Sequence, residues 1–149
     1  MNDLFLLEIR KGSYFLFHIL VWFTIRSKHS GLVLDIARSE HGANIVTFQE
    51  HGGDNQIWKW QGNNLVSKLG YVLDVNASGS EEGTKVIAWK HHGGVNQQWI
   101  MIGDKIISVL NGMCLNIPSN SKSSEAGIVL RSLKSDDVIN NQSWELVYE

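Results

Sequence analysis

Cysteine and proline each occur once in the 149 residues, as Cys114 and Pro118. A single cysteine excludes a disulfide within the chain, so packing has to stabilise the fold. One cysteine does not indicate the cellular compartment either. Because free cysteines are mostly buried in folded proteins, we expect Cys114 to be a small apolar residue of the core.

Charge is also scarce, with 19% charged residues and a formal net charge of −2. The chain has no basic stripe, which argues against nucleic acid as a partner. The same observation argues against binding to anionic lipid headgroups. Hydrophobic residues make up 43%, which fits one domain with a single core and argues against disorder.

No hydrophobic run is long enough to span a bilayer, which requires about 20 residues. Residues 1–21 nevertheless stand apart, because Arg10 and Lys11 precede an apolar run over residues 14–23. This order resembles a signal peptide, but no small-residue cleavage site follows it. The segment is either a relic signal sequence or an extension that leads into the first strand, and we favour the extension. Export is left open, and we expect an extracellular location in preference to a cytoplasmic one.

Glycine, by contrast, occurs 14 times and lies between short apolar runs, a pattern typical of short strands joined by tight turns. One such run recurs as a turn glycine followed by an apolar strand with a polar residue near its end. Its copies cover residues 30–36, 69–75 and 111–117. Internal repetition of this kind predicts several copies of one structural unit.

A second element, Asn-Gln-x-Trp, follows each of these runs after about 20 residues and is part of the same repeat. Its tryptophans, Trp58, Trp99 and Trp144, are 41 and 45 residues apart. Large aromatic side chains dominate the energetics of protein cores, and a buried indole N–H finds an acceptor. We therefore expect these three tryptophans to anchor the core.

A third element lies between the other two and aligns without gaps in the three copies. This alignment places Phe48, Trp89 and Leu133 at one equivalent position. A His-Gly-Gly turn follows in the first two copies, where glycine can adopt positive φ. The aligned segments are residues 42–49, 83–90 and 127–134.

Each copy therefore contains about four short strands, and no stretch shows sustained helical periodicity. A unit of about 40 residues cannot bury its apolar face alone, whereas three units that close around an axis can, and closure removes exposed sheet edges. We predict an all-β fold, a β-trefoil of three pseudo-symmetric four-strand repeats. The domain covers residues 22–149, with repeats at about 22–62, 63–103 and 104–149.

These motifs resemble those of the ricin B-type lectins, also called R-type lectins, from about Phe23 to Tyr148. Three Gln-x-Trp triplets, each preceded by Asn, are the hallmark of that family. The His-Gly-Gly-x-Asn-Gln form of copies one and two is similar to a variant found in invertebrate galactose-binding members, which commonly lacks the family's disulfides. The resemblance implies a β-trefoil that binds galactose or N-acetylgalactosamine at up to three shallow pockets. In those pockets an Asp, an aromatic ring and an Asn contact the sugar.

The chemistry of sugar recognition requires the same residue types. The C–H face of galactose packs on an aromatic ring, a carboxylate accepts bonds from two hydroxyl groups, and an amide both donates and accepts. Copy two supplies the complete set, with two flanking side chains: Asp74, Trp89, Lys90, His92, Asn96 and Gln97. Copy one supplies a similar set with a smaller ring: Asp35, Phe48, His51, Asn55 and Gln56.

The glutamines of these sets, with Gln142, are expected to bond backbone groups and to act on the sugar indirectly. Copy three has Asn116 in place of the Asp and Leu133 in place of the ring, although Asn141 remains. We expect that third pocket to be silent or very weak.

Other functions are less consistent with the sequence. No nucleophile elbow or phosphate loop is present, and each pocket offers one carboxylate where a glycosidase needs two, so we predict no enzyme activity and no catalytic residue. His91 and His92 are adjacent and point to opposite faces of a strand, which argues against a metal site. No cofactor is expected. A β-trefoil that binds protein, as protease inhibitors of this fold do, is the alternative.

The expected partners are galactose-type glycans on glycoproteins or glycolipids. Single shallow pockets bind weakly, so useful affinity requires two pockets on one chain, and homodimerisation would add to it.

Overall fold

The computed structural model describes residues 21–134 and 140–149, so the interpretation of the N-terminal segment lies almost wholly outside the described residues. The first repeat contains β1 (Phe23–Ser27), β2 (Val33–Ile36), β3 (Ile45–Phe48) and β4 (Trp58–Gln61). The second contains β5 (Asn64–Ser67), β6 (Val72–Val75), β7 (Val86–Trp89) and β8 (Trp99–Ile102). The third contains β9 (Lys105–Ser108), β10 (Cys114–Asn116), β11 (Ala126–Gly127), β12 (Val129–Arg131) and β13 (Trp144–Tyr148).

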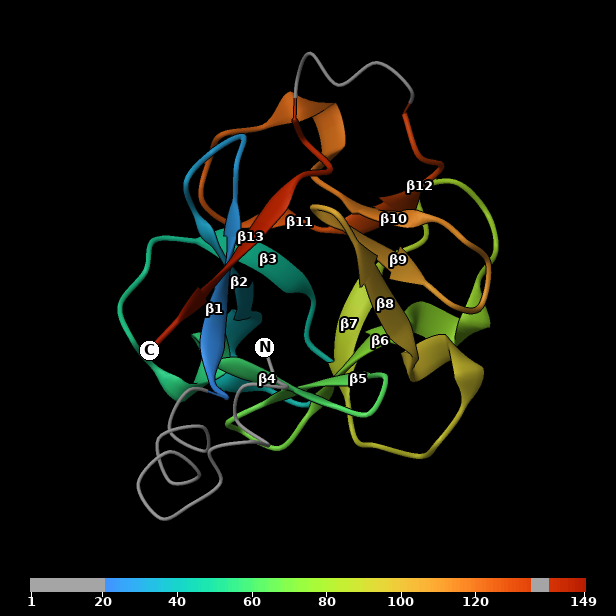
Figure 1. Cartoon of the computed structure of the whole chain (residues 1–149), viewed down its shortest axis with the longest axis horizontal. Coiled ribbons are helices and arrows are strands. Elements are labelled where there is room, and N and C mark those ends of the chain that lie inside the picture. The colour runs from blue at the N-terminus through green and yellow to red at the C-terminus, as the bar shows by residue number, and fades with distance from the viewer. Residues whose placement is uncertain (1–20, 135–139) are drawn as a thin grey trace, which may run out of the picture.

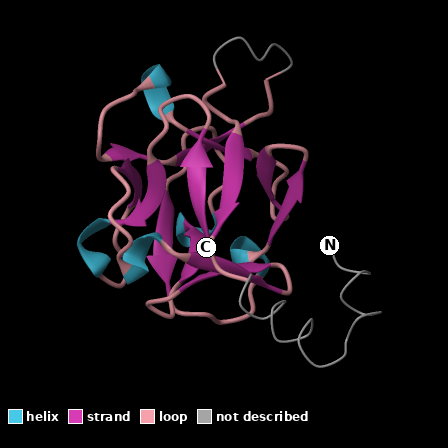
Figure 2. Ribbon diagram, turned by 60° about the vertical axis from the view of Figure 1, so that its left-hand side comes forward, coloured by secondary structure: helices cyan, strands magenta, loops and turns pink. Residues whose placement is uncertain are grey.

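Short 3-10 helices are the only helices in the described part of the chain, and they lie on the loops between strands (Figure 2). In each repeat one of them follows the second strand: η1 (Ala37–Ser39), η3 (Asn76–Ser78) and η5 (Pro118–Asn120). Two more precede a core tryptophan: η2 (Asp54–Gln56) and η4 (Val95–Gln97).

The first and last strands of the repeats form a closed ring. Hairpins β4–β5 and β8–β9 join successive repeats, and β13 pairs antiparallel with β1 to return to the start. Backbone bonds complete the closure, from Trp99 N to Asn63 O (2.8 Å) and from Trp144 N to Asp104 O (2.9 Å). The inner strands pair as β2–β3, β6–β7 and β10–β12. Figure 1 shows the three repeats around a common centre, and the fold is a β-trefoil as predicted.

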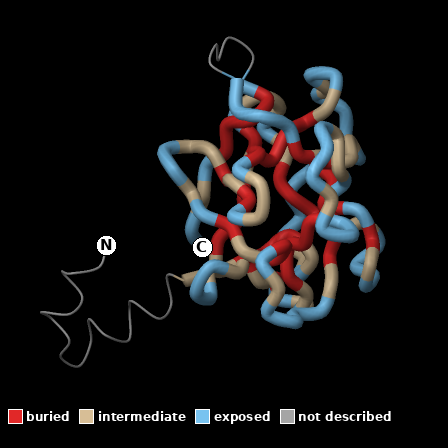
Figure 3. Tube along the Cα trace, turned by 90° about the vertical axis from the view of Figure 1, so that its right-hand side faces the viewer, coloured by how far each residue is buried: buried red, intermediate tan, exposed pale blue. Residues whose placement is uncertain are grey.

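The three repeat tryptophans belong to the hydrophobic core, as the sequence predicted. Figure 3 shows that the buried segments lie in the interior of the domain. Trp58, Trp99 and Trp144 have 0%, 0% and 1% of their surface exposed. Each indole Nε1 donates to the carbonyl of a leucine on the second strand of its own repeat, at 3.4, 3.0 and 3.2 Å. The bonds satisfy the only polar atom of each ring, so its apolar area is buried without an unpaired donor.

Cys114 is buried on β10 and unpaired, as expected, and burial raises the pKa of its thiol. Among the described residues no helix is long and apolar enough to cross a membrane.

The third repeat differs from the gapless alignment by two residues. Val33 pairs with Phe48 and Val72 with Trp89, whereas the equivalent Cys114 pairs with Arg131. Arg131, and not Leu133, therefore stands at the position of the aromatic ring, and Leu133 is an exposed residue further along. The alignment was wrong because it matched Gly127 to the turn glycines of the other repeats.

The residue that adopts the left-handed turn conformation in the third repeat is instead Glu125. Its φ is 65°, compared with 80° at Gly42 and 87° at Gly83. Glycine in a sequence indicates a position with positive φ, but the same position cannot be recognised when another residue occupies it. Residues 118–125 of the third repeat equal residues 76–83 of the second in number, so the glycine at 127, and not the length of this loop, displaced the match.

Candidate functional site

A buried carboxylate lies near the end of the second strand in repeats one and two. Asp35 on β2 and Asp74 on β6 are only 4% and 3% exposed. Each has a glutamine partner: Gln56 Nε2 donates to Asp35 Oδ2 and Gln97 Nε2 to Asp74 Oδ2, both at 2.8 Å. The carboxylates are therefore held in fixed orientations.

The glutamines also hold the turns in place. Gln56 Oε1 accepts a bond from the His51 N–H (2.8 Å), and Gln56 Nε2 donates to the carbonyl of Gln49 (2.8 Å). Gln97 makes the same two bonds to the backbone of His92 and Lys90, both at 2.9 Å. Both glutamines are fully buried, so they position the aspartates and the turns and do not face solvent.

The histidine of each turn points toward the carboxylate. His51 Nδ1 accepts the N–H of Gly53 at 3.0 Å, so a neutral ring carries its proton on Nε2. That Nε2 lies 3.7 Å from Asp35 Oδ2. In repeat two, His92 Nδ1 accepts the N–H of Gly94 at 3.0 Å and its Nε2 lies 3.8 Å from Asp74 Oδ2.

The second glycine of each His-Gly-Gly turn is required by space. A Cβ on Gly53 would lie 2.8 Å from His51 Cε1, and a Cβ on Gly94 would lie 2.6 Å from His92 Cε1. Any larger residue would therefore push the imidazole away from the carboxylate.

The asparagines complete each set. Asn55 Nδ2 donates to the carbonyl of Ile36 at 3.2 Å, and Asn96 Nδ2 to that of Val75 at 3.2 Å and to Asp74 Oδ1 at 3.3 Å. Within the described ranges no hydrogen bond engages Oδ1 of Asn55 or of Asn96. The amide oxygen is thus left as an acceptor beside the carboxylate.

Burial raises the pKa of both aspartates above the usual carboxyl value. Desolvation is the largest cause for Asp35 and for Asp74, and it is opposed by the glutamine bond, by the nearby histidine and by the asparagine. A carboxylate in partial burial with unused acceptor capacity is a strong acceptor for a hydroxyl donor.

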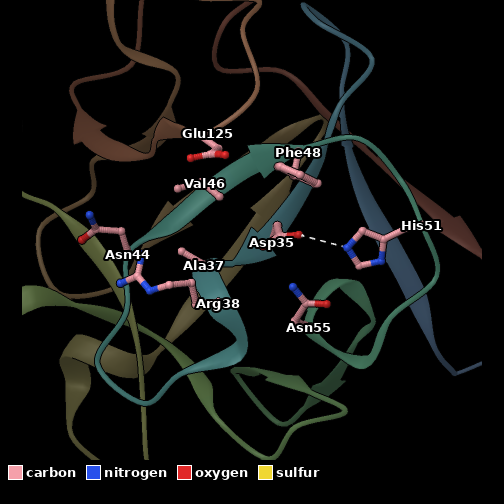
Figure 4. Close-up of a pocket in the computed structure, with 9 residues that line it drawn as sticks. All are labelled: Asp35, Ala37, Arg38, Asn44, Val46, Phe48, His51, Asn55 and Glu125. Carbon is pink, nitrogen blue, oxygen red and sulfur yellow. Dashed lines mark ion pairs between the residues drawn. The ribbon is translucent and has the colours of Figure 1, made fainter.

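These side chains border two cavities of similar size. The cavity of repeat one has a volume of about 420 Å³, and Figure 4 shows Asp35, Phe48, His51 and Asn55 around it. The cavity of repeat two, of about 410 Å³, has the equivalent residues on its wall: Asp74, Trp89, His92 and Asn96. The structure thus brings together eight of the eleven predicted residues. Gln56 and Gln97 stand behind them, and Lys90 is an exposed residue outside the cavity.

Sequence reasoning missed several residues of the two walls. The cavity of repeat one also has Arg38, Asn44 and Glu125, and that of repeat two has Asn76 and Ser78. Glu125 comes from the third repeat and gives the first cavity a second carboxylate, so the expectation of one carboxylate for each pocket was wrong there. No repeat motif marks these positions, because they come from loops of unequal length or from a neighbouring repeat.

The two aromatic platforms have different supports. Trp89 packs against His41 of the first repeat, with ring centroids 4.2 Å apart at 40°. Phe48 lies edge-on to His51 at 6.0 Å. Trp89 is therefore supported by a ring of a neighbouring repeat, whereas Phe48 contacts a histidine of its own repeat.

In the third repeat, Asn116 has the Asp position and is held by Gln142 Nε2 (3.1 Å) and Asn141 Nδ2 (3.4 Å). Lys134 Nζ donates to Asn141 Oδ1 at 3.1 Å, so the amide oxygen that is left as an acceptor in the other repeats is engaged here. Arg131, at the position of the aromatic ring, lies 3.8 Å from Glu82. The set of carboxylate, ring and acceptor amide is absent from this part of the described structure.

No group of three or more His, Cys, Asp or Glu side chains that is suited to a metal ion occurs among the described residues. The side chains that converge are acceptors, amides and rings, which suit a polyhydroxylated ligand with an apolar face.

The closed trefoil carries a carboxylate, a ring and an amide at each of two surface cavities, an arrangement suited to carbohydrate binding. Residues 21–144 match the family model described as the ricin-type beta-trefoil lectin domain, and the chain belongs to that family.

Solved structures agree with this assignment. The chain is similar to a designed threefold-symmetric protein, ThreeFoil, with 32% identity and a TM-score of 0.75 over 85% of this chain and 97% of that one. It is similar to part of an exo-beta-1,3-galactanase from Clostridium thermocellum, with 29% identity and a TM-score of 0.76 over 87% of this chain but only 30% of the enzyme.

The C-half of an earthworm R-type lectin, in complex with GalNAc, has the same fold, with 23% identity and a TM-score of 0.74 over 87% of this chain and 99% of that one. No curated protein sequence matches the chain.

Proposed function

We propose that this domain binds glycans ending in galactose or N-acetylgalactosamine through the cavities of repeats one and two, and that it performs no chemistry on them. One observation carries the proposal: two repeats place the same four functional groups at the same positions, with Asp–His distances of 3.7 and 3.8 Å. In the third repeat, an Asn, an Arg and a Lys occupy the corresponding places of the Asp, the ring and the His.

In this proposal the carboxylate accepts bonds from two hydroxyl groups on one side of the hexose. The oxygen of Asn55 or Asn96 accepts another, and the Nε2–H of the histidine donates to a sugar oxygen. The C–H face of the sugar packs on Phe48 or Trp89. Trp89 offers the larger platform, so repeat two is proposed to bind more tightly.

The GalNAc complex of the earthworm lectin supports the proposed sugar class by analogy of fold. We further propose that the chain belongs with the invertebrate galactose-binding variant that carries His-Gly-Gly-x-Asn-Gln turns. Each site is open and competes with water, so single-site binding is weak, and two sites on one chain raise the avidity for a glycoprotein or glycolipid surface.

The proposal is tested on a glycan array with purified protein, followed by competition with free lactose. Galactose-terminated glycans are expected to be retained and to be released by lactose. The double variant Asp35→Asn/Asp74→Asn is expected to lose this binding, whereas Lys90→Ala, a change at an exposed residue outside the cavity, keeps it. Absence of glycan binding, or binding that the double variant retains, would overturn the proposal.

A further inference from the structure

Glu125 occupies a position at which the other two repeats have glycine. The strand register makes Val129 of repeat three equivalent to Val46 and Ile87. Counting back four residues from each, Glu125 has the same position in its repeat as Gly42 and Gly83 have in theirs. All three residues have positive φ, and all three N–H groups donate to the strand of the next repeat that pairs with its second strand, which is β3, β7 or β12. The acceptors are Thr47 O for Glu125 (2.6 Å), Ala88 O for Gly42 (2.7 Å) and Leu130 O for Gly83 (2.8 Å).

A side chain at this position faces the platform residue of the next repeat. A Cβ added to Gly42 would lie 3.3 Å from Trp89 Cζ3, and a Cβ added to Gly83 would lie 3.9 Å from Arg131 Nη2. The side chain of Glu125 accordingly reaches the cavity of repeat one, where Figure 4 shows it beside Val46 and Phe48. Its negative charge adds to the desolvation that raises the pKa of Asp35.

The left-handed conformation is unfavourable for a residue with a side chain, by about 1–2 kcal/mol. Two of the three repeats avoid that strain with glycine, and the third does not. Glu125 is one of eight described non-glycine residues with positive φ, and its side chain borders a cavity, where backbone strain is often found.

Charge sets the two cavities apart. The cavity of repeat one contains the carboxylates of Asp35 and Glu125, the guanidinium of Arg38 and the ring of His51. Arg38 is highly exposed, with its Nε 3.5 Å from Glu40, whereas Glu125 lies beside Val46 and Phe48. The cavity of repeat two contains one carboxylate, Asp74, with His92. A like charge placed near a carboxylate raises the free energy of binding, and because Glu125 is exposed, dissolved salt screens part of that repulsion.

We infer that Glu125 is a specificity-determining residue supplied to the sugar site of repeat one by repeat three. It disfavours saccharides that carry a carboxylate or a sulfate and favours neutral sugars and amino sugars, while the site of repeat two lacks this filter. The inference rests on the proposed lectin function. The two sites of one chain then differ in the glycans they accept.

The test uses single-site proteins, because two sites would mix their signals. Asp74→Asn leaves the site of repeat one, and Asp35→Asn leaves that of repeat two. Asn116 shows that an Asn fits this position of the fold. Galactose, galacturonic acid and galactosamine are titrated against each protein, with chemical shifts in NMR spectra as the readout. These probes share one ring and differ in charge.

In the protein that retains site one, Glu125→Gln is expected to narrow the preference for galactose over galacturonic acid about three- to tenfold, and added salt is expected to narrow it further. The preference for galactosamine over galactose is expected to fall by about threefold in the same variant, because the amino group loses its attraction to the Glu125 carboxylate. Glu125→Gly, which restores the residue of the other repeats, should act in the same direction. Glu50→Gln is the matched control, because Glu50 pairs with Arg26 outside the cavity.

An unchanged preference in Glu125→Gln and in Glu125→Gly, with galactose still bound, would overturn the inference and leave the lectin function intact. The same change of preference in the protein that retains only site two would also overturn it. If the unaltered protein binds none of the sugars, the proposed function fails and this inference fails with it.

Discussion

Gln97 Nε2 donates a 2.8 Å hydrogen bond to Asp74 Oδ2, and the same atom donates to the carbonyl of Lys90 at 2.9 Å. One buried amide therefore connects the candidate sugar acceptor to the end of the platform strand β7. Gln56 makes the equivalent connection in repeat one and Gln142 in repeat three, to Asn116 and to the carbonyl of Ser132. The Gln-x-Trp triplet thus has two duties, because its tryptophan fills the core and its glutamine shapes the surface above it.

Replacement of Gln97 by leucine is expected to destabilise the domain by about 1–3 kcal/mol, because Asp74 and backbone groups of the turn lose their buried partners. Chemical denaturation measures the change. Gln98→Leu is the matched control, since Gln98 is a less buried neighbour that makes no such bonds among the described residues. A control that is destabilised as much as Gln97→Leu would argue against the role assigned to Gln97.

The variant Asp74→Asn distinguishes the contribution of the carboxylate charge to sugar binding from its contribution to stability. Asn116 accepts the same glutamine bond in repeat three, so the variant is expected to fold with unchanged or slightly higher stability at neutral pH, where the ionised Asp74 is desolvated. Loss of the charge-assisted bonds is expected to weaken galactose binding at site two by roughly tenfold or more. Thermal unfolding and calorimetric titration of the Asp35→Asn background measure the two effects. Unchanged galactose affinity in this variant would contradict the assigned role of Asp74.

Sugar binding and the ionisation of the two aspartates are linked. Because burial raises the pKa of Asp35 and Asp74, binding is expected to weaken as the pH falls, beginning above the usual carboxyl range. Titrations at constant salt, from neutral pH downward, measure this loss of affinity. Affinity that stays constant until the usual carboxyl pKa would contradict the prediction.

The same two aspartates are expected to make the fold more stable as the pH falls, whereas sugar affinity decreases. A pKa that is raised in the folded state means that the protonated form stabilises the fold, and this stability is lost as the pH rises through the folded-state pKa. The difference in unfolding free energy between wild type and Asp74→Asn should therefore move in favour of wild type as the pH falls. Denaturation of both proteins over the same pH series measures it, and a difference that moves the other way would be inconsistent with desolvation as the main cause.

Glu125→Gly is expected to stabilise the domain by about 0.5–1 kcal/mol, because relief of the left-handed strain exceeds the entropy that glycine adds to the unfolded chain. Thermal or chemical unfolding provides the measurement. Glu125→Ala is the control, since alanine removes the carboxylate and keeps the strain. Equal stabilisation by alanine would attribute the effect to charge instead of backbone conformation.

Much of the fold could be predicted from residue order alone. Apolar runs, turn glycines and regularly spaced tryptophans each report a local requirement, and all three recur with one period, so a closed trefoil follows from them. The predicted core role of Trp58, Trp99 and Trp144 is confirmed. Asp35, Asp74 and their asparagines were predicted to meet an aromatic ring of the same repeat, and the structure places each set around one cavity.

The third repeat shows the limit of such reasoning. The alignment matched Gly127 to the turn glycines of the other repeats because the residue type was the same. In the structure the residue with the equivalent backbone conformation is Glu125, which has positive φ like Gly42 and Gly83. Strand pairing, which depends on hydrogen-bond register, then sets Arg131 opposite Cys114 and leaves Leu133 exposed.

The amino-acid sequence by itself determined the repeat, the strands and the residue types that each repeat offers, because these depend on local propensity and on periodic burial. Tertiary structure alone decided which repeat contributes to which cavity. Glu125 enters the site of repeat one, and His41 braces the ring of repeat two, because closure of the ring brings each loop against the next repeat. Contacts across that closure have no period along the chain, and hence no sequence pattern records them.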